Sequence, residues 1–160
     1  MWQELIEVLD KLIQNYAQVL DLNKKKRVIL MQVDFKALDA VLQQENKLAA
    51  QVAANEAARK IVLQKLSSQY PEIKADTKML EISQYCPGEK KEELQECHDR
   101  LGQLVQASAE ASDANRLLIS AALSAVNYQL NVLGDTKVTP LYGANGTEQI
   151  SKNKKFDFEA

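Results

Sequence analysis

The chain has 160 residues, of which 46% are hydrophobic and only 6% aromatic, with five glycines and three prolines. This length predicts one domain that can bury a core, and the abundance of Ala, Leu, Gln, Lys and Glu favours helix over a β-sandwich. The 20 basic and 22 acidic residues give a net charge of −2, so the basic excess typical of nucleic-acid-binding proteins is missing.

The first predicted element is a helix over residues 2–31, because apolar residues recur there three or four apart. Its apolar face consists of Leu5, Leu9, Leu12, Tyr16, Val19 and Leu20, with Ile6 and Ile13 alongside. The cations at residues 24–27 spread around the helix, so we expect them to form a solvated face. Asp34 is the expected N-cap of the next helix. The pattern leaves open whether the break near Gln32 and Val33 is a kink or a full turn.

The second predicted helix covers residues 35–68. Its expected apolar face consists of Phe35, Leu38, Leu42, Ala49, Val52, Leu63 and Leu66. Glu45, Glu56 and Arg59 interrupt this face, and we expect them at its edge, with their aliphatic stems over apolar surface. Tyr70 before Pro71 predicts the end of the helix, because the residue before a proline disfavours the helical conformation.

Residues 72–88 are expected to hold a short connecting helix that is capped by Asp76. Its apolar residues are Met79, Leu80, Ile82 and Tyr85. A turn at Cys86, Pro87 and Gly88 then leads into a long third helix over residues 89–133. Gly134 is the expected left-handed residue that ends this helix.

The third helix carries an apolar stripe too wide for one neighbouring helix. Its seam, with residues alternately three and four apart, is Leu94, Cys97, Leu101, Leu104, Ser108, Ala111, Asn115, Leu118, Ala122, Ala125, Gln129 and Val132, and Val105, Ile119, Val126 and Leu133 widen it. Residues 117–134 contain no charge, and only Ser120, Ser124, Asn127 and Asn131 form a narrow polar strip. Two helices of the chain bury this surface, or part of it binds another protein. We expect both.

These elements predict an all-α protein, an elongated antiparallel bundle of three long helices with a short connecting helix and a flexible C-terminal arm. The bundle is expected over residues 1–134 as a single domain, and the arm over residues 135–160. The N-terminus lacks the basic region of a signal peptide. The uncharged run at 117–134 is short and rich in Ser, Asn and Gln, so we expect no direct membrane insertion and a cytoplasmic location.

No pattern typical of catalysis is present, and no catalytic, cofactor or metal site is predicted. The chain has a single histidine, His98, and the residue three positions before it is Gln95 rather than a glutamate. The Glu-x-x-His pair of di-metal bundles is therefore missing. Cys86, Cys97 and His98 match no standard zinc spacing and lack a fourth ligand. A disulfide between the two cysteines stays open. No glycine-rich phosphate loop occurs.

The third helix and the tail resemble the FlgN family of flagellar type III export chaperones. The residues that carry the resemblance are the run from Asn115 to Ile119, the run Asn127-Tyr128-Gln129-Leu130-Asn131-Val132-Leu133, and the tail motif Pro140-Leu141-Tyr142-Gly143-Ala144-Asn145-Gly146. Glu45-Asn46-Lys47-Leu48 is similar to a Glu-x-Lys-x-Leu pattern of the family, although Leu48 follows Lys47 directly. The small, Ala- and Ser-rich residues at 120–125 depart from it.

The resemblance implies a cytoplasmic chaperone that binds the hook–filament junction proteins FlgK and FlgL and needs no cofactor. The third helix would bind the terminal amphipathic helix of the cargo, and the tail tyrosine would dock on the cytoplasmic domain of the export gate FlhA. The implied cargo-binding residues are Asn115, Leu118, Ile119, Ala122, Val126, Asn127, Leu130 and Leu133. The implied gate-docking residues are Leu141, Tyr142, Gly143 and Gly146.

Two other classes of protein remain as alternatives. A non-catalytic helical scaffold or coiled-coil homo-oligomer would bury the third helix against its own copy, and a weak homodimer stays open. The other alternative to the chaperone is a metal- or thiol-dependent enzyme. At the level of single residues, Tyr142 can instead fold back onto the bundle, and Leu118 and Val132 can belong to the protein's own core.

Overall fold

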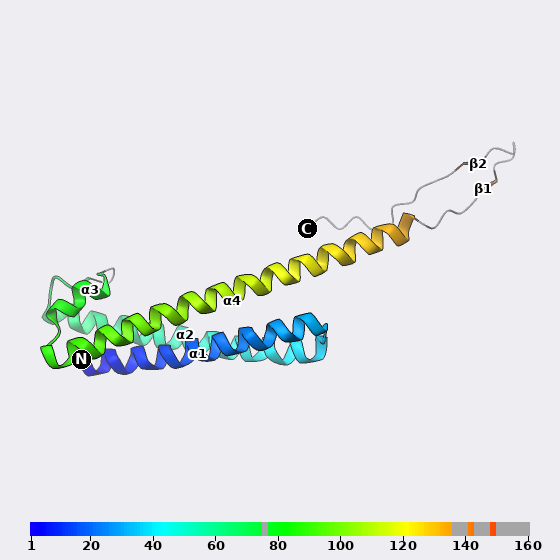
Figure 1. Cartoon of the computed structure of the whole chain (residues 1–160). Coiled ribbons are helices and arrows are strands. Elements are labelled where there is room, and N and C mark those ends of the chain that lie inside the picture. The colour runs from blue at the N-terminus through cyan, green and yellow to red at the C-terminus, as the bar shows by residue number, and fades with distance from the viewer. Residues whose placement is uncertain (75–76, 136–140, 143–147, 150–160) are drawn as a thin grey trace. The chain divides into compact units, whose positions relative to one another are not determined.

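The computed structural model describes residues 1–74, 77–135, 141–142 and 148–149 (Figure 1). It contains the helices α1 (Trp2–Gln32), α2 (Phe35–Gln69), α3 (Met79–Ile82) and α4 (Gly88–Asp135), and the 3₁₀ turn η1 (Ser83–Tyr85). The two-residue strands β1 (Leu141–Tyr142) and β2 (Glu148–Gln149) pair antiparallel. The predicted all-α class is confirmed, and the ends of the three long helices lie within two residues of their predicted positions.

The chain divides into two compact units, Met1–Asn115 and Arg116–Ala160. This division falls inside α4, whereas the domain boundary was predicted after residue 134. The expected C-terminal arm lies mostly outside the described residues, apart from Asp135, which ends α4, and the strands β1 and β2. Each unit is therefore described by itself.

In the first unit, α1 and α2 form an antiparallel helical hairpin. Lys65 Nζ lies 2.9 Å from Glu4 Oε2, and Lys26 Nζ lies 2.8 Å from Glu45 Oε2. Residue numbers therefore fall along α2 as they rise along α1. The Lys26–Glu45 pair is mostly shielded from solvent, so Lys26 does not belong to the solvated face that was predicted for residues 24–27. Glu45 lies at the edge of the helix contact because it pairs with this lysine.

The break between α1 and α2 is a full turn with a left-handed residue. Val33 has φ 56° and ψ 34°, and its N–H donates to Leu30 O while Asp34 N–H donates to Ile29 O. This pair of bonds is the Schellman arrangement, in which the left-handed position is usually a glycine. Asp34 Oδ1 then accepts a hydrogen bond of 3.0 Å from Ala37 N, which confirms the predicted N-cap.

Replacing Val33 with glycine is expected to stabilise the protein by about 1 kcal/mol. A β-branched residue in the left-handed region costs about 1–2 kcal/mol, and the greater freedom of glycine in the unfolded chain offsets part of that gain. The Val33 side chain is largely exposed, so little packing is lost. The midpoint of urea unfolding measures the change.

The matched control is Val28→Gly, because Val28 is also exposed but lies inside α1. There the same substitution should destabilise the protein by about 0.5 kcal/mol, since glycine is the poorer helix former. A loss of stability at both positions would contradict the strain at Val33.

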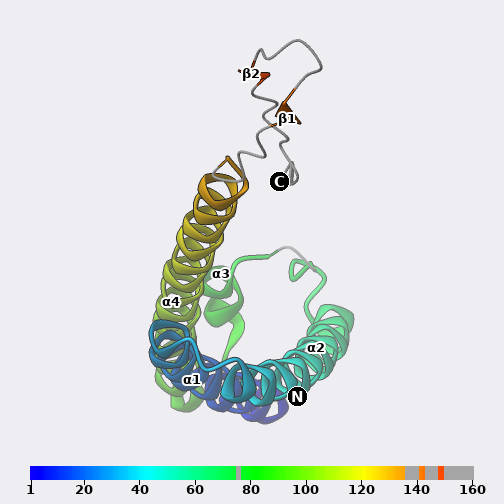
Figure 2. The same ribbon diagram turned by 90° about the vertical axis from the view of Figure 1, so that its right-hand side faces the viewer.

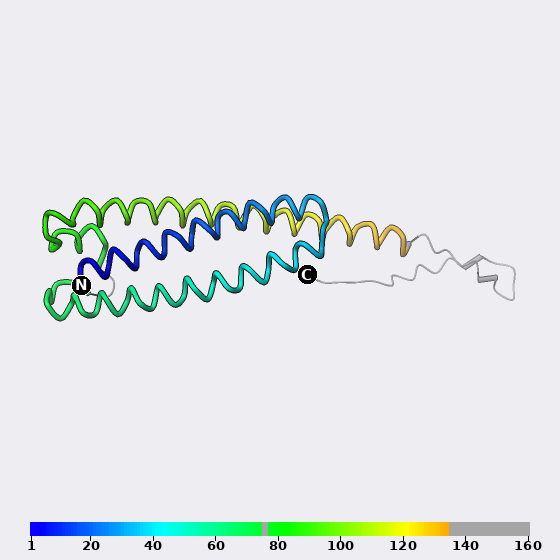
Figure 3. The backbone as a smooth tube through the Cα atoms, turned by 90° about the horizontal axis from the view of Figure 1, so that it is seen from below, coloured from blue at the N-terminus to red at the C-terminus, as the bar shows by residue number. Residues whose placement is uncertain are grey.

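The part of α4 that belongs to the first unit runs parallel to α1. Lys90 Nζ donates to Gln3 Oε1 at 2.6 Å, and Ser108 Oγ donates to the carbonyl oxygen of Tyr16 at 3.3 Å. In Figures 2 and 3, α1 lies between α2 and this part of α4. In the first unit, α2 is thus antiparallel to α1, and this part of α4 is parallel to α1. The full antiparallel bundle of three long helices stays a prediction.

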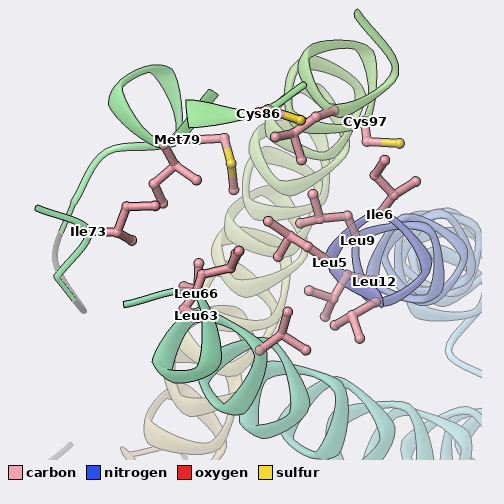
Figure 4. Close-up of a cluster of buried hydrophobic side chains, with 14 of the residues drawn as sticks. Leu5, Ile6, Leu9, Leu12, Leu63, Leu66, Ile73, Met79, Cys86 and Cys97 are labelled. Atoms are coloured by element: carbon pink, nitrogen blue, oxygen red, sulfur yellow. The ribbon is translucent and has the colours of Figure 1, made fainter. Parts of the chain in front are cut away.

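The core of the first unit lies at the end where the chain begins. Its buried side chains come from α1 (Leu5, Ile6, Leu9, Leu12), α2 (Val62, Leu63, Leu66), the connection (Ile73, Met79, Ile82, Cys86) and α4 (Leu94, Cys97). Figure 4 shows most of these side chains gathered between the ribbons. The connection therefore closes one end of the unit, and its predicted short helix is confirmed as α3, although Leu80 is exposed.

Several sequence predictions about single residues are wrong. Phe35, Leu42 and Ala49 were expected on the buried face of α2, but all three are exposed, and Val41 is buried instead. The reason is that α1 covers only a narrow face of α2. Gly134 lies inside α4 rather than after its end. Asp76, the expected cap of the connecting helix, lies outside the described residues.

Candidate functional site

The candidate site is the part of α4 in the second unit, where large apolar side chains are exposed. Leu117 is 72% exposed, Tyr128 70%, Leu123 59% and Val126 51%. No charged residue occurs between Leu117 and Gly134. A contiguous apolar surface of this kind on a soluble protein marks a site of interaction.

The apolar residues of this segment fall into two main groups around the helix axis, at about 100° per residue. We call Leu117, Ala121, Tyr128 and Val132 the first stripe, and Ile119, Leu123, Val126, Leu130 and Leu133 the second stripe. The polar strip, made of Ser120, Ser124, Asn127 and Asn131, separates them on one side. On the other side they are separated by two alanines, one leucine and one glutamine: Ala125, Leu118, Gln129 and Ala122. The centres of the two stripes are about 170° apart, so they face nearly opposite directions.

Most of the predicted cargo-binding residues lie at this site. Ala122, Val126, Leu130 and Leu133 are exposed, whereas Leu118, Ile119 and Asn127 are half-buried. Val126, Leu130, Leu133 and Ile119 all belong to the second stripe. Their role in binding stays a prediction.

Asn115, which was also predicted to bind cargo, lies inside the contact between α1 and α4. It is only 2% exposed, and its Nδ2 donates to the backbone oxygen of Asn23 at 2.9 Å and to Asn23 Oδ1 at 3.3 Å. Asn23 Nδ2 donates in turn to the carbonyl oxygen of Val19. Because both side chains are buried, Asn115 positions α4 against α1 in this state rather than facing a partner.

Four large residues of the site were absent from the predicted cargo-binding set: Leu117, Leu123, Tyr128 and Val132. Leu117, Tyr128 and Val132 belong to the first stripe, and the heptad seam includes only Val132 of these three. The lack of charge over the whole run was the signal that could have found them, because a helix whose full circumference is uncharged needs partners on more than one side.

The two thiols lie in the core of the first unit. Both cysteines are free and buried. Cys97 Sγ donates to Asp10 Oδ1 at 3.5 Å, and burial together with this carboxylate raises the pKa of Cys97 to about 11. Burial also raises the pKa of Cys86. Both thiols are therefore protonated at neutral pH and are poor nucleophiles. Over residues 1–74, 77–135, 141–142 and 148–149, no group of three or more His, Cys, Asp or Glu could hold a metal ion.

The predicted gate-docking motif is described only in part. Leu141 and Tyr142 form β1, in which Leu141 pairs with Gln149 and Tyr142 with Glu148. Gly143 and Gly146 lie outside the described residues. The backbone pairing places Leu141 and Tyr142 in a short antiparallel ladder.

One helix in the described part of the chain, α4, is long and apolar enough to cross a membrane. This differs from the expectation that the uncharged run is too short and too polar to do so. None of the apolar window is buried, and length and composition are weak evidence by themselves.

A comparison with protein-family models gives one finding. The family described as FlgN protein matches residues 1–150. No curated protein and no solved structure matches the chain.

Proposed function

The chain belongs to the FlgN family, and from this membership we propose that it is a cytoplasmic chaperone for hook–filament junction proteins of the FlgK and FlgL type. Flagellar export chaperones make up this family. In the proposed cycle the chain masks a terminal amphipathic helix of the cargo and delivers the cargo to the export gate FlhA. It acts by binding alone and is not an enzyme.

The observation that carries this proposal is the exposed, uncharged surface of α4 between Leu117 and Leu133. A cargo helix that later polymerises must hide its own apolar face beforehand. A helical surface lined by Leu, Val and Ile can cover such a face by helix-to-helix packing, in the manner of an amphipathic helix in an apolar groove. The absence of charge matters because a charged side chain in that contact would be desolvated without a partner.

The tail supplies the second part of the proposal, which is docking on the gate. Tyr142 combines an apolar ring with a hydroxyl group, so it can bury surface and make a hydrogen bond at the same time. Leu141, Gly143 and Gly146 would complete a short docking segment. We propose that the part of the chain after α4 carries this segment.

Size-exclusion chromatography with light scattering tests the chaperone function. The purified chain is mixed with a purified junction protein from the same genome. A monomer that becomes a one-to-one complex supports the proposal. A tight dimer that binds no junction protein, with residues 117–133 as its interface, would establish the helical scaffold instead.

Tyr142→Ala is expected to leave the affinity for the junction protein unchanged and to reduce binding to the FlhA cytoplasmic domain by at least about 10-fold, since a buried aromatic anchor contributes about 2 kcal/mol or more. Calorimetric titration of each partner measures both affinities. Tyr142→Phe is the matched control, because it retains the ring and removes only the hydroxyl. If Tyr142→Ala instead weakens cargo binding, the division between cargo helix and docking segment is wrong.

A further inference from the structure

We propose that the exposed part of α4 binds two helices of one cargo molecule at the same time, one along the first stripe and one along the second. This inference rests on the proposed function and specifies the cargo that the site accepts. The partner would be a protein whose terminal region presents two amphipathic helices with uncharged apolar faces.

The width of the apolar surface requires more than one helix. A helix that packs against a neighbour uses an apolar face of about 100° or slightly more. At about 100° per residue, Leu118 lies about 100° and Leu123 about 240° around the helix axis from Leu117. The arc that contains both stripes therefore covers about 240° of the circumference. A single cargo helix on the second stripe would therefore leave Leu117 and Tyr128 in water on the opposite side of α4.

Both stripes contain large side chains that are more than half exposed. Leu117 and Tyr128 of the first stripe are more exposed than Leu123 and Val126 of the second. The second unit therefore covers neither stripe with its own described residues at these positions. Any partner that hides only one of them leaves the other as an exposed apolar patch, which carries a risk of aggregation.

The chemistry of the two stripes differs and indicates what each would accept. The second stripe consists of branched aliphatic residues, which suit a cargo helix with a similar aliphatic face. Along the first stripe the small Ala121 lies between the large Leu117 and Tyr128, so the stripe suits a helix with a bulky side chain over Ala121. The Tyr128 hydroxyl can stay near water, because its position borders the polar strip.

A single partner that supplies both helices is favoured over two separate partners. Once the first helix has bound, the second is held nearby at a high effective concentration and loses little further freedom of translation. Two separate molecules would each lose that freedom in full.

Two double variants of the full chain test the inference. The first is Leu117→Ser with Tyr128→Ser, and the second is Leu123→Ser with Val126→Ser. Each should weaken binding of the junction protein on the order of 100-fold, because each removes one of two linked contacts. The matched control, Ser120→Asn with Ser124→Asn, changes the polar strip and should leave the affinity unchanged. Circular dichroism verifies that all variants stay helical.

Hydrogen exchange of the cargo identifies the two helices. In complex with the wild-type chain, two separate segments of the junction protein should be protected. The first double variant should release one segment and the second should release the other. One protected segment, or unchanged affinity in the first double variant, would overturn the two-helix inference while leaving the chaperone function intact. No binding by the wild-type chain would instead refute the proposed function.

Two further measurements exclude other occupants of the first stripe. A wild-type dimer that the first double variant converts to a monomer would overturn the inference in favour of self-association. Flotation with phosphatidylglycerol vesicles tests a lipid surface. Vesicle binding that requires the first stripe would overturn the inference too, whereas a monomer that does not float supports it.

Discussion

Val126→Asp is expected to weaken binding of a junction protein on the order of 100-fold or more, and Leu130→Asp should have a similar effect. Both residues belong to the second stripe and are exposed in the free chain. In the complex they would be covered by the cargo helix, where a carboxylate without a partner costs about 3–5 kcal/mol. In the free chain the same carboxylate remains in water, so the helix itself should form normally.

The measurement is a calorimetric titration of the junction protein, accompanied by far-UV circular dichroism of each variant. Ser124→Asp is the control, because it adds the same charge to α4 on the polar strip and should leave the affinity within about twofold of wild type. If Val126→Asp or Leu130→Asp loses helicity, these side chains belong to a core of the chain itself, and their assignment to the cargo surface is wrong.

Leu66→Ala is expected to lower the free energy of unfolding by about 3 kcal/mol. Leu66 is completely buried among residues of α1, the connection and α4, and truncation of a leucine in such a place leaves a cavity. A loss of this size is a large part of the stability of a small domain. Urea unfolding followed by circular dichroism provides the measurement.

Ile61→Ala provides the comparison for Leu66→Ala. Ile61 lies in the same helix but is more than half exposed, so its truncation should cost less than about 1 kcal/mol. Equal losses at the two positions would contradict the location of the core at this end of the first unit.

Local signals in the sequence predicted the helices well. The apolar spacing, Asp34 as an N-cap, and Pro71 after Tyr70 depend on neighbouring residues only, and the observed helices begin and end within two residues of these predictions. The buried face of α2 was harder to predict, because it depends on how many helices surround α2. With α1 on one side, Val41 is buried and Phe35 is exposed.

The candidate site was predicted in part for a related reason. A heptad seam describes one line of contact along a helix, and it led to Leu118 and Ala122 but away from Leu117 and Tyr128. The seam also assigned Asn115 to the same surface as the leucines that follow it. The burial of Asn115 and its hydrogen bonds to Asn23 show that this amide packs against α1 in the first unit.

The Asn23–Asn115 pair fixes the axial position of α4 along α1. A shift of one helical turn, about 5.4 Å, would move the two amides out of reach of each other and leave polar groups unpaired in a buried contact. Each unpaired group would cost about 1–3 kcal/mol, which is enough to suppress sliding. Every molecule therefore has the same register between α1 and the part of α4 that belongs to the first unit.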